Sequence, residues 1–143
     1  MKSLILSVGA IAVVMVASSA SAQQRVNLRA GFLPDPQQVS VFSGGGNDAS
    51  NLGRSCVGRI SDTPDVVLNY SSSGGRLAFK VVSNGDTSLV INGPDGRYYC
   101  ADDSSGLNPI LDWGNAPSGQ YDIWVGAVGD AASGTLLISE SSF

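Results

Sequence analysis

The sequence contains no histidine among its 143 residues. Histidine is the side chain that ordinarily supplies a neutral base near pH 7, so its absence excludes Ser-His-Asp and Cys-His catalytic groups. It also excludes metal sites that need an imidazole ligand. The chain has no Gly-x-Ser-x-Gly motif, which carries the nucleophile of many serine hydrolases. We therefore expect the protein not to be an enzyme.

Glutamate and lysine are scarce as well. The twelve acidic residues are eleven aspartates and Glu140, and Lys80 is the only lysine outside the first 22 residues. Asp favours turns and caps, whereas Glu and Lys favour helices, so the composition predicts strands and turns. The formal net charge of −4 argues against a nucleic acid partner and against anionic membrane surfaces.

The first 22 residues have the pattern of a secretory signal peptide. Lys2 is followed by an apolar run over residues 4–17 and then by the small residues Ala20-Ser21-Ala22. The run is shorter than the roughly 20 apolar residues of a transmembrane helix, so we expect cleavage after Ala22 and no membrane insertion. The mature protein is expected to be a monomer in the periplasm or outside the cell.

The rest of the chain is predicted to form one domain. Residues 23–36 show no clear periodicity of apolar and polar residues, and Pro34-Asp35-Pro36 prevents a helix there. We therefore expect a signal peptide at 1–22, an extended N-terminal lead-in at 23–36 and a β-sandwich domain at 37–143.

Cys56 and Cys100 are the only cysteines. An exported protein meets an oxidising compartment, so a single disulfide between them is the expected state. It would close a loop of about 45 residues, and the chain-entropy model gives a stabilisation of roughly 4 kcal/mol for such a loop. The alternative is a pair of free, buried thiols.

Short runs rich in β-branched and aromatic residues follow the lead-in at intervals of about ten residues, each closed by Gly, Asn, Asp or Ser. The runs are 38–42, 57–60, 65–70, 77–82, 88–92, 97–101, 110–113, 120–127 and 134–140. We predict an all-β fold, a single antiparallel β-sandwich of jelly-roll type with about eight strands. Residues 48–52 are expected to form one short turn of helix.

Alternation of apolar and polar residues predicts which strand faces form the core. Three groups of residues share a face at a period of two. They are Leu77, Phe79 and Val81; Leu89 and Ile91; and Tyr121, Ile123 and Val125.

The segment from Phe79 to Glu140 contains an ordered set of motifs. Residues 86–91 (Asp-Thr-Ser-Leu-Val-Ile) lead to the turn Gly93-Pro94-Asp95-Gly96, and residues 117–125 have the pattern Pro-x-Gly-x-Tyr-x-hydrophobic-x-Val. In this order of elements the segment resembles the bacterial pre-peptidase C-terminal domain. The resemblance implies a small jelly-roll-like sandwich of an exported protein that binds or supports a partner. It also implies calcium, because some members of that family bind it.

Acidic and amide side chains gather in the turns of this segment. Calcium takes six to eight hard oxygen ligands, and such turns can supply them. Adjacent Asp102 and Asp103 would also repel each other unless solvated or bridged by a cation. The alternative is that the same side chains cap turns by bonding their own backbone. The expected calcium ligands are Asp86, Asn92, Asp95, Asp102, Asp103 and Asp112.

Carboxylate catalysis is the enzymatic alternative. Asp86-Thr87-Ser88 fits an aspartic-protease motif, which needs a second carboxylate to share one proton. The second candidate, Asp62-Thr63-Pro64, has proline in the wrong place. A pair of aspartates could also hydrolyse a glycosidic bond. A Ser/Lys dyad would need Lys80, which alternates with core residues and is expected on the solvent face.

Aromatic residues on neighbouring strands are the candidate binding groups. Tyr99, Trp113 and Trp124 could stack on sugar rings or anchor a protein partner if they are exposed. The alternative is that they pack under loops. We interpret the protein as an exported, non-catalytic module that binds a protein, polysaccharide or cell-envelope partner and is stabilised by calcium. A carboxylate-based peptidase or glycosidase and a self-assembling surface protein are the alternatives.

Overall fold

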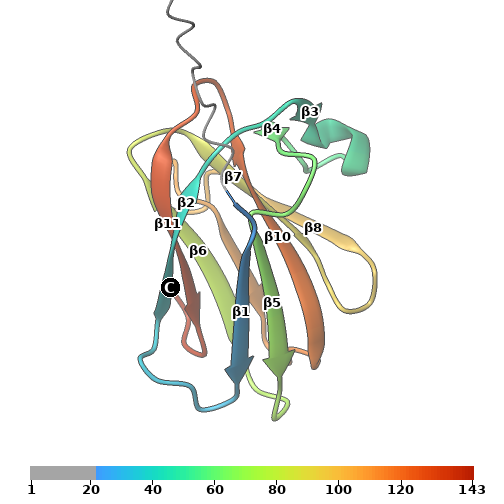
Figure 1. Cartoon of the computed structure of the whole chain (residues 1–143), viewed down its shortest axis with the longest axis vertical. Helices are drawn as coiled ribbons and strands as arrows, with labels where there is room; N and C mark the ends of the chain where they lie inside the picture. Colours follow the sequence, from blue (N-terminus) through green and yellow to red (C-terminus); the bar gives the residue numbers. More distant parts are fainter. Residues whose placement is uncertain (1–21) are drawn as a thin grey trace, which may run out of the picture.

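Two β-sheets packed face to face make up the protein (Figure 1). A computed structural model describes residues 22–143, so the predicted signal peptide lies outside the described residues except for Ala22. The strands are β1 (Gln24–Arg29), β2 (Gln37–Phe42), β3 (Asn47–Asp48), β4 (Arg59–Ile60), β5 (Val66–Ser71), β6 (Leu77–Ser83), β7 (Thr87–Asn92), β8 (Tyr98–Ala101), β9 (Ile110–Trp113), β10 (Gly119–Ala127) and β11 (Ser133–Ser139). The predicted all-β sandwich is confirmed.

The larger sheet is organised around β10. Its first half pairs with β5, which carries β1 on its other side, and β7 and β8 follow on the opposite edge of β10. The short strands β3 and β4 continue the sheet beyond the start of β5, where Arg59 of β4 pairs with Ala127 of β10. The smaller sheet has the order β2-β11-β6-β9. We call these the large sheet and the small sheet.

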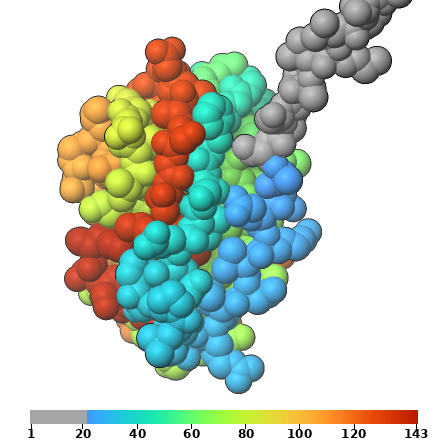
Figure 2. All heavy atoms as spheres, turned by 60° about the vertical axis from the view of Figure 1, so that its left-hand side comes forward, coloured from blue at the N-terminus to red at the C-terminus, as the bar shows by residue number. Residues whose placement is uncertain are grey.

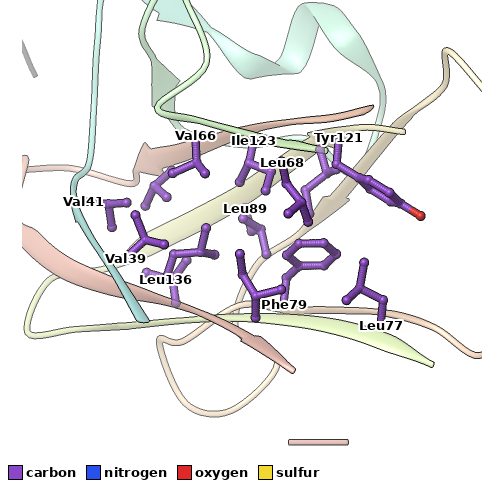
Figure 3. Close-up of a cluster of buried hydrophobic side chains, with 14 of the residues drawn as sticks. Val39, Val41, Val66, Leu68, Leu77, Phe79, Leu89, Tyr121, Ile123 and Leu136 are labelled. Atoms are coloured by element: carbon purple, nitrogen blue, oxygen red, sulfur yellow. The ribbon is translucent and has the colours of Figure 1, made fainter. Parts of the chain in front are cut away.

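The core lies between the two sheets, and all eight residues of the three predicted apolar faces belong to it. Phe79 and Tyr121, from opposite sheets, are both fully buried, with their ring centroids 5.8 Å apart. Figure 3 shows the side chains of the two sheets pointing toward each other, with Leu89 between them. The period-two alternation thus identified the side of each strand that faces this core correctly, although β7 is buried on its other side as well.

The predicted lead-in at 23–36 instead begins with a strand of the large sheet. β1 pairs with β5 in parallel over six residues, from Gln24 opposite Val66 to Arg29 opposite Ser71. Val26 and Leu28 pack against the core, while the other residues of β1 are exposed and polar. The sandwich therefore starts at Gln24 rather than at residue 37, it contains one parallel strand pair, and it has eleven strands where about eight are predicted.

The expected helical turn is present as a 3-10 helix, η1 (Ala49–Leu52). Asp48 directly precedes it and caps its N-terminus. The Asp48 carboxylate accepts a hydrogen bond from the Ser50 N–H at 2.9 Å. No helix within residues 22–143 is long and apolar enough to cross a membrane.

Gly45 lies where two chain segments approach closely. A Cβ at this position would lie 2.2 Å from the backbone of Ile60 and Ser61, whereas a Cβ on the neighbouring Gly46 would meet nothing within 4 Å. We expect Gly45→Ala to lower the free energy of unfolding by about 1–3 kcal/mol, because β4 must move away. Gly46→Ala should change it by less than about 0.5 kcal/mol. Urea unfolding of both variants checks this, and equal losses would contradict the close approach.

Candidate functional site

Three carboxylates meet at one end of the large sheet. Asp86 comes directly before β7, and Asp102 and Asp103 come directly after β8. Because β7 and β8 are antiparallel partners, the start of one and the end of the other lie at the same end of the sheet. Oxygen atoms of the three carboxylates lie within 4.8 Å of one another. Figure 2 shows the two segments, coloured yellow-green and orange, side by side on the surface. We call these three residues the acidic cluster.

The electrostatics of the acidic cluster are unfavourable without a counter-charge. Asp86 Oδ1 and Asp102 Oδ1 are buried, and neither has a hydrogen-bond partner among the described residues. Burial raises the pKa of the Asp86 carboxyl, and the negative charges of Asp103 and Asp102 raise it further. Buried carboxylate oxygens are normally hydrogen-bonded or bound to a cation, so these two oxygens distinguish the acidic cluster from the solvated turn carboxylates elsewhere in the chain.

The backbone that carries the acidic cluster is held by its own hydrogen bonds. The Asp86 carbonyl accepts from the Val128 N–H at 3.0 Å, which ties the cluster to the β10–β11 turn. The Ser104 hydroxyl donates to the Asp102 carbonyl at 2.9 Å and accepts from the Ile110 N–H at 3.0 Å. The carboxylates therefore project from turns whose backbone is already fixed.

The other three predicted calcium ligands lie elsewhere. Asn92 and Asp95 belong to the opposite end of the β7–β8 hairpin, where Asn92 Nδ2 donates to the Gly96 carbonyl at 3.0 Å. Asp95 accepts from the Tyr99 hydroxyl at 2.6 Å and from the Arg97 N–H, and these bonds lower its pKa. Asp112, on the small sheet, forms an ion pair with Arg76. The six-residue set is therefore too broad, because strand length separates the two ends of the hairpin.

The three predicted binding aromatics fall into two groups. Tyr99 and Trp113 pack edge to face, with ring centroids 4.9 Å apart, and Trp113 also contacts Phe79 and Tyr121. These two aromatics close one end of the core. Trp124 points to the opposite side of the large sheet, where its ring centroid lies 6.1 Å from that of Tyr98. Tyr98, which is 43% exposed, was not among the three predicted binding aromatics.

Trp124 and Tyr98 form part of the wall of a pocket of about 300 Å³. Its lining residues come from β3, η1, β4, β8, β10 and the residues directly after β4. Figure 1 shows the arrangement of these elements. We call this pocket the aromatic pocket. It is lined by Asn47, Asp48, Asn51, Leu52, Ile60, Ser61, Asp62, Tyr98 and Trp124.

A disulfide holds the wall of the aromatic pocket against the sheet. Cys56, in the segment after η1, is bonded to Cys100 of β8, which confirms the predicted pairing. Cys56 packs with Ile60 and Trp124 in a second apolar cluster, separate from the main core. The bond fits an exported protein, since disulfides persist in oxidising compartments.

The rim of the aromatic pocket is polar. Asp62 accepts a hydrogen bond from Asn47 Nδ2 at 2.6 Å. The bond from the Ser50 N–H holds the pKa of Asp48 below its usual value, so this carboxylate is ionised at neutral pH. Trp124 is only 9% exposed, and its Nε1–H has no acceptor among the described residues.

Asp65 is a buried carboxylate that the sequence did not single out. Its Oδ2 accepts the Val125 N–H at 2.8 Å where β5 begins beside β10. The residue is 9% exposed, and burial raises the pKa of its carboxyl to about 6 although the Val125 N–H opposes this shift. It lines a shallow hollow of about 230 Å³ between β1 and β2. In the structure its carboxylate accepts the hydrogen bond of a backbone N–H of β10, that of Val125.

No family model matches the chain. An uncharacterized protein of Synechococcus elongatus is 34% identical over 93 residues, which are 62% of this chain and 63% of that protein. The chain therefore spans less than two thirds of this relative's length.

Two solved structures resemble the fold at low sequence identity. One is the pre-peptidase C-terminal domain of a collagenase from Bacillus anthracis, with a TM-score of 0.48, 14% identity, and coverage of 85% of this chain and 97% of that one. The other is PliG from Aeromonas hydrophila, a periplasmic inhibitor of g-type lysozyme, with a TM-score of 0.40, 12% identity, and coverage of 82% and 98%. Both likenesses concern the fold alone.

Proposed function

We propose that the protein is an exported, non-catalytic binding module whose acidic cluster holds a calcium ion. The observation that carries the calcium site is the pair of buried, unpartnered oxygens of Asp86 and Asp102 beside the carboxylate of Asp103. The partner of the module is a protein, a polysaccharide or another component of the cell envelope.

Calcium suits the acidic cluster because the available donors are hard oxygens. The group contains three carboxylates and no sulfur or imidazole, which favours calcium over zinc or copper. Backbone carbonyls and water complete the coordination of calcium in many proteins. The ion would connect the β6–β7 turn to the loop that follows β8 and would remove the repulsion among the three carboxylates.

The arrangement of the carboxylates supports a binding role over hydrolysis. An aspartic protease would need Asp86 and Asp62 side by side. Asp62 instead lines the aromatic pocket, whereas Asp86 belongs to the acidic cluster. None of the three cluster residues lines the aromatic pocket, so the acidic cluster and the aromatic pocket are separate sites.

Calcium is expected to raise the thermal stability of the oxidised protein. An ion that binds only the folded state at about 100 times its dissociation constant adds roughly 2.7 kcal/mol, which corresponds to about 10 °C for a domain of this size. Thermal unfolding in millimolar calcium and again in a chelator measures the difference.

Two variants make this experiment specific. Asp102→Asn removes a ligand charge and should abolish most of the calcium-dependent shift. Asp112→Asn removes an aspartate of the original predicted set that lies on the small sheet, and it should keep the full shift. Equal midpoints in calcium and chelator would contradict the site, as would a shift that survives in Asp102→Asn.

A further inference from the structure

We propose that the aromatic pocket binds a sugar ring of a neutral polysaccharide. This inference rests on the proposed binding role and names both the site and the class of ligand. The pocket lies on the outer face of the large sheet, away from the acidic cluster, and it combines an aromatic wall with a polar rim.

The aromatic wall provides the apolar contact that a sugar ring needs. The rings of Tyr98 and Trp124 are inclined at 43° to each other, so together they form an angled wall. Trp124 is held in place by the second apolar cluster, while Tyr98 is 43% exposed and available to a ligand. Aromatic rings give large contact areas at low conformational cost, and the apolar C–H face of a pyranose packs against such surfaces.

The polar rim offers both hydrogen-bond acceptors and hydrogen-bond donors to the hydroxyl groups of a sugar. The carboxylates of Asp48 and Asp62 accept hydrogen bonds, and the amides of Asn47 and Asn51 can both donate and accept. All four residues are exposed, so their free donor and acceptor positions face the solvent around the pocket. A sugar hydroxyl donates one hydrogen bond and accepts others, which no purely cationic or purely anionic group can do.

A cationic ligand fits the same groups less well. An ammonium group has no acceptor and cannot use the amide donors of Asn47 and Asn51 on the rim. Arg59 already lies close to Asp48, and its guanidinium donates to the Gly46 carbonyl at 2.5 Å. This guanidinium offsets part of the negative charge of the rim, so the pocket favours a neutral, hydroxylated ligand over a lysine-rich one.

The pocket is also built in advance of binding. The Cys56–Cys100 disulfide joins the segment that carries η1 to β8, the strand that carries Tyr98. The bond between Asn47 and Asp62 connects the two ends of the same segment. Rigid walls reduce the ordering cost of binding, which matters for weak contacts such as those to sugars.

Affinity electrophoresis of the oxidised protein tests the inference. The probes are dextran, laminarin, galactomannan and hydroxyethyl cellulose, each cast in a native gel, with hexalysine as the cationic competitor in solution. We expect at least one polysaccharide to retard the protein, with hexalysine leaving this retardation unchanged. If no polysaccharide in the panel retards the protein, or if hexalysine displaces the polysaccharide, the inference is overturned.

Matched variants locate the binding. Tyr98→Ala should raise the dissociation constant about tenfold or more for the retarding polysaccharide, since one stacking contact is lost. Phe143→Ala, which removes a ring of similar exposure elsewhere, should leave it unchanged. Asp62→Asn should weaken binding without lowering the melting temperature. Retardation that persists unchanged in Tyr98→Ala would place the ligand elsewhere and overturn the inference.

The outcome is separable from that of the calcium experiment. If calcium does not shift the melting temperature, the proposed metal site is contradicted, and the polysaccharide experiment still tests the sugar site independently. Absence of retardation in a protein that calcium stabilises removes the sugar site alone.

Discussion

Removing the disulfide is expected to lower the melting temperature by about 15 °C. Cys56 and Cys100 are 44 residues apart, and the chain-entropy model gives a stabilisation of about 4 kcal/mol for a loop of this length. In a chain of this size each kcal/mol of stability changes the melting temperature by about 4 °C. The Cys56→Ala/Cys100→Ala variant, compared with the oxidised protein by calorimetry, measures the loss. The effect is large because the bond closes a long loop and so restricts the unfolded chain.

The reduced wild-type protein is the matched control for that variant. It keeps both sulfur atoms in the second apolar cluster, so it separates the covalent link from the packing of Cys56. Both forms should melt at nearly the same temperature, and both should bind the retarding polysaccharide more weakly. Melting temperatures within about 3 °C of the oxidised protein would contradict a structural role for the bond.

Replacing Asp65 is expected to stabilise the protein at neutral pH. The pKa of its carboxyl is raised from 3.8 to about 6, so between these values the folded state keeps a proton that the unfolded state has released. The contribution of Asp65 to stability is therefore most favourable below about pH 4 and is lost as pH rises through about 6. The loss amounts to about 3 kcal/mol at 1.36 kcal/mol per pKa unit.

The Asp65→Asn variant tests this linkage. Its amide oxygen can still accept the Val125 N–H, but the side chain no longer ionises in a buried position. Urea unfolding should show the variant more stable than wild type by up to about 3 kcal/mol at pH 7 and equal to it near pH 4. Asp112→Asn, at an exposed ion pair, should show no such gain. A variant that is less stable at pH 7 would contradict the raised pKa.

The fold could be predicted from local patterning except at its N-terminal edge. Alternation identified the buried faces of β6, β7 and β10 because each strand has one side in the core. β1 was missed because its apolar positions, Val26 and Leu28, are few and the two prolines beyond it suggested an extended lead-in. Its pairing with β5 is parallel and distant in sequence, so no turn signal marks it.

The candidate sites were predictable in part. Asp86, Asp102 and Asp103 were identified by residue type, and antiparallel pairing of the strands that carry them explains why they meet. The aromatic pocket was not predicted, because β3, η1 and β4 belong to an irregular segment whose position depends on distant contacts. The available signals were period two in β8, which places Tyr98 and Cys100 on one face, and the cysteine partner in that segment.

Calorimetric titration of calcium into chelator-treated protein is the measurement that tests the central claim most directly. The account predicts one ion bound per chain, with binding lost or strongly weakened in Asp102→Asn and retained in Asp112→Asn. A chain that takes up no calcium, or that binds it equally well after the Asp102→Asn substitution, would contradict the assignment of the acidic cluster as a calcium site.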